Sequence, residues 1–151
     1  MDEKLWRKFS AYIRLRDTDH NYEGKCCTCG TTVDSTDADA GHYIPVGVSN
    51  LLKFLECNVH IQCKKCNQLE YGREEEYKEF MIQMYDEKLV EILEGLKHKM
   101  GKFDIDFYNK GITHYSAANK ILVRLKTQDI RTPEYLYDYN QSILSLKPYI
   151  L

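Results

Sequence analysis

Two pairs of cysteines carry the clearest chemical signal in this chain. Each pair has the CxxC spacing, which places two thiolates on one tight turn. Four thiolates together satisfy the tetrahedral coordination of structural zinc, whereas free thiols or an iron–sulfur centre are the alternatives. The sequence therefore predicts one structural Zn2+ site with four ligands: Cys26, Cys29, Cys63 and Cys66.

Two further cysteines lie outside this pattern. Cys27 sits inside the first pair and could compete with Cys26 or Cys29 for the metal, although Cys26 and Cys29 match the CxxC spacing better. Cys57 precedes an apolar stretch, and we interpret it as a buried thiol.

Polar side chains lie between the two pairs and directly after the second: Asp39, His42, Asn58, His60 and Asn67. A cysteine knuckle, an extended segment, a strand at NVHIQ (58–62), a second knuckle and a helix follow one another in that order. This order predicts a ββα-metal unit closed by zinc. In such a unit the histidine of the first strand can point at the first turn of the helix, where the zinc clip fixes Asn67.

Each of these residues also has a purely structural interpretation. A lone strand histidine is more often a surface or core residue than a base. Asn67 could cap a helix, and Asp39 could stabilise a turn. The joint pattern, with four cysteines at these spacings, favours one functional site over the three separate explanations.

The motifs also resemble a known family. CxxC, a strand histidine, an asparagine and a CxxC followed by His or Asn is the pattern of HNH, or His-Me finger, nucleases. LWRKFSAYIRLRD, CCTCG, DAGHYIP and NVHIQCKKCN together resemble the NinG/Rap recombination family of lambdoid phages over roughly residues 5 to 85. The CxxCN motif is also similar to phage endonuclease VII, a junction-resolving nuclease.

This resemblance implies a role for each polar residue. His42 matches the general base that takes a proton from the attacking water. Asn67 matches a ligand of a catalytic divalent ion, and a neutral oxygen ligand suits Mg2+ or Mn2+. Asn58 matches the asparagine that orients the histidine ring through its backbone or side chain.

The sequence departs from the family pattern at one position. HNH enzymes commonly have an acidic metal ligand directly before the base, and here that position is Gly41. Asp39 lies two residues earlier, and His60 shares one strand face with Asn58 and Gln62. We therefore expect both Asp39 and His60 to line the catalytic metal site, with their division of labour open.

The charge distribution gives a local rather than a global indication of DNA binding. The net charge is −2, so the whole chain does not have the charge of a nucleic-acid binder. A helix predicted over residues 3 to 17 has a basic face, and two lysines lie in the second knuckle. The candidate phosphate contacts are Arg7, Lys8, Arg14, Arg16, Lys64 and Lys65. A solvated helix face is the alternative.

The family resemblance implies structure-selective cleavage of branched DNA such as Holliday junctions and D-loops. Cutting opposite strands of a junction needs two active sites, which favours a homodimer. An HNH nuclease acting on ordinary duplex DNA and a non-catalytic zinc-finger module that binds DNA are the alternatives. The chain has no signal peptide and no apolar run long enough to span a bilayer, so we expect a phage or prophage protein in the bacterial cytoplasm, without a membrane partner.

The predicted architecture is α+β, with a zinc-stapled, treble-clef-like ββα-metal core. Residues 1–72 are expected to form the basic helix and nuclease core, and residues 73–151 a helical extension that packs on the core or forms a dimer interface. We predict helices over 73–85 and 86–100, with Asp86 as N-cap between them. Residues 101–111 are predicted to be a connection, followed by helices beginning at caps Ser116 and Thr132. The C-terminal tyrosines are expected to pack in the core, with a dimer contact or base stacking as the alternatives: Tyr135, Tyr137, Tyr139 and Tyr149.

Overall fold

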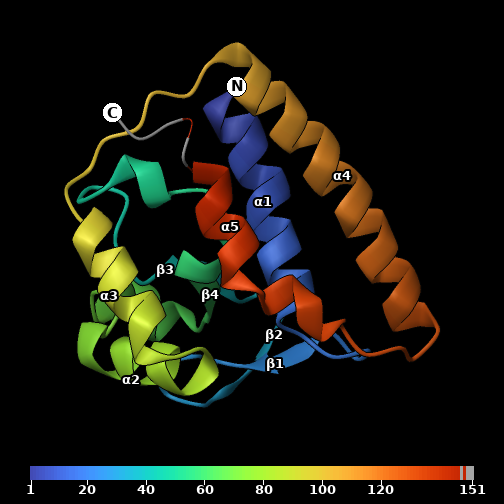
Figure 1. Cartoon of the computed structure of the whole chain (residues 1–151). Helices are drawn as coiled ribbons and strands as arrows, with labels where there is room; N and C mark the ends of the chain where they lie inside the picture. Colours follow the sequence, from blue (N-terminus) through green and yellow to red (C-terminus); the bar gives the residue numbers. More distant parts are fainter. Residues whose placement is uncertain (147, 149–151) are drawn as a thin grey trace.

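The computed structural model describes residues 1–146 and 148, which form an α+β fold (Figure 1). Its helices are α1 (Asp2–Arg16), α2 (Glu74–Met84), α3 (Glu87–Leu96), α4 (Ile105–Thr127) and α5 (Tyr139–Leu146). Its strands are β1 (Glu23–Lys25), β2 (Thr32–Asp34), β3 (Asp39–His42) and β4 (Val59–Gln62), and a short helix at Lys65–Leu69 follows β4. The predicted α+β class is confirmed.

The strands form two separate antiparallel hairpins. β1 pairs with β2, and the turn between them carries the first cysteine pair. β3 pairs with β4 across a long loop, with Asp39 opposite Gln62 and Gly41 opposite His60. Because side chains alternate along a strand, these four residues share one face of the β3–β4 hairpin, whereas Ala40, His42, Val59 and Ile61 share the other.

The two faces of this hairpin belong to different layers of the molecule. Ala40 and Val59 are buried against α1 and α4, in a cluster with Leu5, Phe9 and Tyr115. A second apolar cluster lies under α2 and α3 and is built around buried leucines of the β3–β4 loop and of α3, together with Tyr77 and Met81 of α2. The hairpin therefore stands between two cores.

The helical half agrees with the sequence only in part. Asp86 caps α3 by accepting a hydrogen bond from the backbone N–H of Leu89 at 2.8 Å, as predicted. The predicted connection at 101–111 is wrong, because α4 begins after Asp104, whose carboxylate accepts from the N–H of Phe107. Ser116 is therefore inside a helix rather than at its start.

A glycine within α4 explains that error. The sequence pattern places Gly111 in a loop. In the structure it lies inside α4, where a Cβ at this position would be 2.8 Å from the Leu5 side chain of α1. The glycine thus lets α4 approach α1 closely, and Figure 1 shows the two helices lying side by side. A sequence cannot distinguish a helix–helix contact glycine of this kind from a helix-breaking one.

The final predicted helix is also shorter than expected. Residues Glu134–Tyr137 form one 3-10 turn, and α5 begins only at Tyr139, so Thr132 does not cap a long helix. The Tyr137 hydroxyl lies 2.9 Å from the carbonyl oxygen of Arg16, which joins this segment to the end of α1. Tyr135 is 75% exposed, against the expectation of core packing, and Tyr149 lies outside the described residues. Within the described residues, no helix is both long and apolar enough to cross a membrane.

Candidate metal centre and catalytic site

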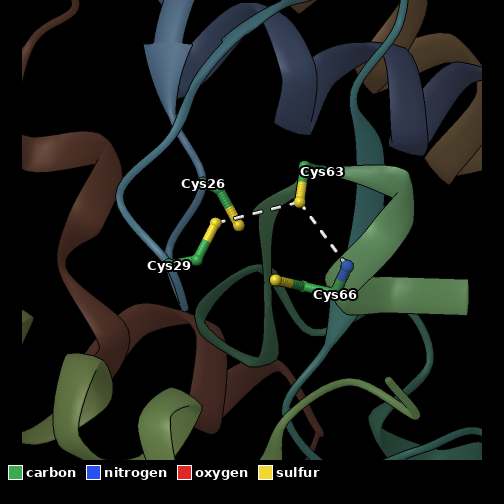
Figure 2. A group of neighbouring side chains, drawn as sticks. All are labelled: Cys26, Cys29, Cys63 and Cys66. Atoms are coloured by element: carbon green, nitrogen blue, oxygen red, sulfur yellow. Dashed lines mark hydrogen bonds between the residues drawn. The ribbon is translucent and has the colours of Figure 1, made fainter. Parts of the chain in front are cut away.

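The four predicted zinc ligands converge in space. Cys26 and Cys29 lie in the β1–β2 turn, while Cys63 follows β4 and Cys66 lies in the short helix after it (Figure 2). Their Sγ atoms all lie within 4.8 Å of one another, and Cys29 and Cys63 are 3.8 Å apart. A tetrahedral Zn2+ with Zn–S bonds of about 2.3 Å needs S···S separations of about 3.8 Å. The four thiols therefore fit one zinc ion.

The other two cysteines do not join this group. The half-buried Cys27 has its thiol beside Tyr77, and desolvation raises the pKa of this thiol far above its ordinary value. Cys57 is 3% exposed, and burial likewise raises its pKa to about 12. Neither Cys27 nor Cys57 belongs to the group of Sγ atoms that lie within 4.8 Å of one another. The structure thus resolves the competition between Cys27 and its neighbours in favour of the CxxC cysteines.

Asn67 is held between the zinc cysteines and the β3 strand. Its backbone N–H donates to the carbonyl oxygen of Cys63 at 3.0 Å, so the second knuckle fixes its position. Its side-chain Nδ2 donates to the Asp39 carboxylate at 2.8 Å, and Gln68 donates to the same carboxylate oxygen at 2.7 Å. Asp39 therefore orients Asn67, and this contact turns the Asn67 Oδ1 away from Asp39.

Gly41 also lies close to Asn67. A Cβ built at Gly41 would be 3.0 Å from Asn67 Oδ1. The expectation that His42 points at the helix is thus wrong, because His42 is one residue further along the strand and projects from the opposite face. Gly41, directly before His42 in the sequence, is thus next to Asn67 in space.

Gln62 fills the space above Gly41, and the sequence analysis did not include it among the site residues. The Gln62 Oε1 would be only 1.9 Å from a Cβ at Gly41, and it is buried without a hydrogen-bond partner among the described residues. The available signal was strand alternation, which places residue 62 on the same face as His60 and opposite Asp39.

His60 is directed away from Asn67. Its Nε2 lies 2.8 Å from the Tyr85 hydroxyl and its Nδ1 lies 3.3 Å from the Tyr77 hydroxyl, which itself donates to the Gly41 carbonyl at 2.8 Å. Since Tyr77 uses its proton on Gly41, it accepts from Nδ1–H of His60, and Nε2 accepts from Tyr85. Burial lowers the pKa of His60 to about 3, so the ring is neutral at physiological pH.

His42 lies on the α1 face of the hairpin. Its ring stacks on Trp6 with 5.2 Å between centroids, and its Nε2 is 2.9 Å from the Lys53 carbonyl oxygen. A carbonyl only accepts, so Nε2 carries the proton and Nδ1 has the free lone pair in the neutral ring. Burial of this ring lowers its pKa below the ordinary 6.5. A neutral histidine with a free lone pair has the electronic state that a general base requires.

Asn58 acts on the loop that holds His42 rather than on the ring itself. Fully buried, it exchanges two hydrogen bonds with the backbone of Ile44 and donates a third to the Leu52 carbonyl at 3.2 Å. Its own carbonyl accepts from Tyr43 N–H. Asn58 thus fixes both ends of the loop between His42 and Lys53, whose carbonyl oxygen orients the histidine.

The predicted DNA contacts divide into exposed and buried residues. Arg7, Lys8, Lys64 and Lys65 are exposed and Arg14 is half-buried. Arg16 is 1% exposed and does not belong to this surface. Its guanidinium pairs with Asp17 at 2.6 Å and donates to the Val59 carbonyl at 2.8 Å. The prediction for Arg16 failed because helical spacing cannot show that a basic side chain has buried acceptors.

Among the described residues, only the four cysteines form a group of three or more His, Cys, Asp or Glu ligands. A second, catalytic ion would therefore need amide oxygens among its ligands. The oxygen of Asn67 and the orphaned oxygen of Gln62 face one small space, and both are hard ligands of the kind that Mg2+ or Mn2+ prefers. The residues present fit such an ion.

The fold and the site together define a small α+β protein with a four-cysteine metal centre and a polar site next to it. A family model described as "Bacteriophage Lambda NinG protein" matches residues 1–125, and the chain therefore belongs to the NinG family. No solved structure matches the chain.

Curated relatives support this assignment. The chain is 34% identical to "Protein ninG" of Escherichia phage lambda over 97 residues, which are 64% of this chain and 45% of the relative. It is 39% identical to "Protein ninG" of Salmonella phage P22 over 74 residues, 49% of this chain and 34% of the relative. The matches thus span less than half the length of these relatives.

Proposed function

We propose that this chain is a metal-dependent DNA endonuclease of the HNH, or His-Me finger, class. The observation that carries the proposal is the joint position of Asn67 and His42 around Gly41. Asn67 is fixed through the zinc knuckle, its Oδ1 lies beside Gly41, and the next residue along the strand is a neutral histidine. In this interpretation the β3–β4 hairpin and the short helix are the ββα-metal unit, with Mg2+ or Mn2+ as the catalytic ion.

The proposed roles follow from the functional groups of His42 and Asn67. In an in-line displacement at phosphorus, the attacking water and the leaving oxygen lie on opposite sides. His42 would take the proton of the water through Nδ1, while the Lys53 carbonyl oxygen holds the ring by Nε2. Asn67 would hold the ion, which when bound stabilises negative charge on the leaving oxygen.

The proposed substrate is branched DNA in the bacterial cytoplasm. Membership of the NinG family and the similarity of CxxCN to a junction-resolving nuclease support this choice. Phosphates would be gripped by the exposed basic side chains Arg7, Lys8, Arg14, Lys64 and Lys65, without base readout. A homodimer would supply the two active sites that symmetric cutting of a junction requires.

A cleavage assay tests this proposal. Zinc-loaded protein is incubated with a labelled four-way junction or a linear duplex of the same arm sequences, with Mg2+, Mn2+ or EDTA. We expect metal-dependent cutting of the junction, and a loss of about 100-fold or more in His42→Ala, because general base catalysis contributes about 10²–10⁴. His20→Ala is the matched control, since His20 is an exposed histidine paired with Asp129.

The same assay separates the alternatives. Equal cutting of duplex and junction would replace the branched substrate with ordinary duplex DNA. Binding of DNA without cutting under any metal condition would support the non-catalytic zinc module and contradict the nuclease. If zinc-loaded His42→Ala cuts as fast as the parent, then His42 is not the base.

A further inference from the structure

We infer that Gln62 is a ligand of the catalytic ion and replaces the acid that HNH enzymes have at the position of Gly41. The inference rests on the proposed function, because it concerns the same ion. Three observations lead to it: the orientation of two amide groups, the space at Gly41 and the missing partner of one buried oxygen.

The orientation of the Gln62 amide is fixed by its neighbours. Its Nε2 donates to the Gly72 carbonyl at 3.0 Å and to the Thr28 hydroxyl at 3.2 Å. A carbonyl oxygen only accepts, so rotating the amide by half a turn would bring two oxygens together. The Oε1 of Gln62 must therefore face Gly41, where it has no protein donor.

The Asn67 amide is oriented in the same way from the other side. Its Nδ2 faces the Asp39 carboxylate, which also only accepts when ionised. Oδ1 of Asn67 is therefore directed to the space at Gly41, as Oε1 of Gln62 is. Two partial negative charges directed into one small space repel each other unless a cation or a donor lies between them.

Gly41 makes this arrangement possible. Among the glycines, only Gly30 and Gly72 have positive φ, so the backbone of Gly41 would accept a side chain. Space is the restriction, because a Cβ at Gly41 would lie 1.9 Å from Gln62 Oε1 and 2.8 Å from Gln62 Cδ. An acid at position 41 and Gln62 in its present place thus exclude each other. A glycine at position 41 is therefore what leaves room for the Gln62 side chain.

Metal binding without DNA tests the inference. Mn2+ alone is titrated into zinc-loaded protein, and the free ion is followed by electron paramagnetic resonance. Gln62→Met keeps the approximate shape of the side chain and removes the oxygen. We expect its Mn2+ affinity to fall at least about tenfold, because mutating even a group that only supports a metal ligand lowers metal affinity by about 10- to 100-fold. Gln83→Met, on the exposed side of α2, is the matched control. Melting temperature and zinc content verify the fold of each variant.

A second variant keeps the test decisive if Gln62→Met is unstable. Gln62→Ala together with Gly41→Asp removes the glutamine and returns a carboxylate to the usual position. We expect this double variant to bind Mn2+ at least tenfold more tightly than Gln62→Ala alone. Failure of the folded, zinc-loaded double variant to regain binding contradicts the inference.

The outcomes for this inference and for the proposed function are distinct. Unchanged Mn2+ affinity in Gln62→Met, or no Mn2+ binding by the parent, overturns Gln62 as a ligand and leaves a bridging water as the partner of its oxygen. A parent that cuts junctions while Gln62→Met binds Mn2+ normally retains the nuclease and loses the inference. A parent whose Mn2+ binding depends on Gln62 but that never cuts DNA retains the metal site and loses the nuclease.

Discussion

The two faces of the β3–β4 hairpin differ in what remains unsatisfied on them. On the α1 face, buried apolar side chains pack around Ala40 and Val59, and even the buried Arg16 has all its contacts in place. On the opposite face, Asp39, Gly41, His60 and Gln62 meet the short helix and α2, and Gln62 Oε1 is buried without a partner among the described residues. In the described part of the chain the other such oxygen, Asn119 Oδ1, lies in α4 and not on the hairpin. The α1 face stabilises the fold by packing, whereas the opposite face holds an oxygen that is free to accept a hydrogen bond or to bind a cation.

His42 is the polar residue on the otherwise apolar α1 face of the hairpin. It lies on the packed face, yet Trp6 and the Lys53 carbonyl hold it in one orientation with a free Nδ1. A base needs a fixed ring and a neutral state, and packing provides both. A metal ligand needs an oxygen with no other partner, which a packed apolar face cannot provide. His42 thus has the protonation state of a base, and the amide oxygens of Asn67 and Gln62 lie on the other face of the hairpin.

The largest effect that we expect concerns the zinc clip, since it holds the polar face but not the α1 face. Cys66→Ala removes one thiolate and should abolish zinc binding, because three ligands hold structural zinc poorly. We expect the melting temperature to fall by about 10 °C or more, as a loss of about 4–5 kcal/mol does in a chain of this size. Calorimetry and atomic emission measure the two quantities.

Cys57→Ala is the control for this prediction. It removes a buried thiol outside the metal group and should retain one zinc per chain. If Cys66→Ala retains zinc and its melting temperature, the cysteine cluster does not stabilise the polar face, and the comparison between the faces loses its basis.

The second prediction tests the α1 face through two neighbouring arginines. Arg16→Met leaves Asp17 buried without its partner and should destabilise the fold by about 3–5 kcal/mol. Arg14→Met alters a half-buried side chain and should change the free energy of unfolding by about 0.5 kcal/mol or less. Urea denaturation monitored by circular dichroism measures both changes.

DNA binding should show the reverse order. Arg14→Met is expected to weaken junction binding and to reduce its salt dependence, whereas Arg16 has no access to phosphates. Equal stability losses in the two variants would mean that the buried Arg16–Asp17 ion pair does not stabilise the α1 face more than an ordinary half-buried side chain does.

Local spacing and strand alternation account for what the sequence predicted well. The CxxC pairs, the strand at 59–62 and the Asp86 cap depend on residues close together in the chain, so they could be predicted. Arg16, Gly111 and Gln62 could not, because each depends on a partner far along the chain. Arg16 meets Val59, Gly111 meets Leu5, and the Gly41–Gln62 contact depends on the register between two strands joined by a long loop.

The smallest effect that we expect is a shift in the titration of His42. Burial lowers its pKa below 6.5, so the folded chain binds fewer protons on this ring than the unfolded chain as pH falls through 6.5. The neutral ring therefore persists to lower pH than in an unfolded chain, and the stability contributed by burying it neutral is lost progressively below pH 6.5. Ring nitrogen shifts in two-dimensional NMR measure this pKa without any need for cleavage.

Trp6→Leu provides the matching perturbation, because it removes the stacked ring and opens His42 to water. The His42 pKa should move back toward 6.5, and the acid limb of the cleavage profile should move to higher pH by the same amount. An unchanged NMR titration in Trp6→Leu would show that the packed face does not set the protonation state of His42. A shifted titration with an unshifted cleavage profile would retain the packing effect but assign proton transfer to another group, because the pH dependence of cleavage must follow the pKa of its base.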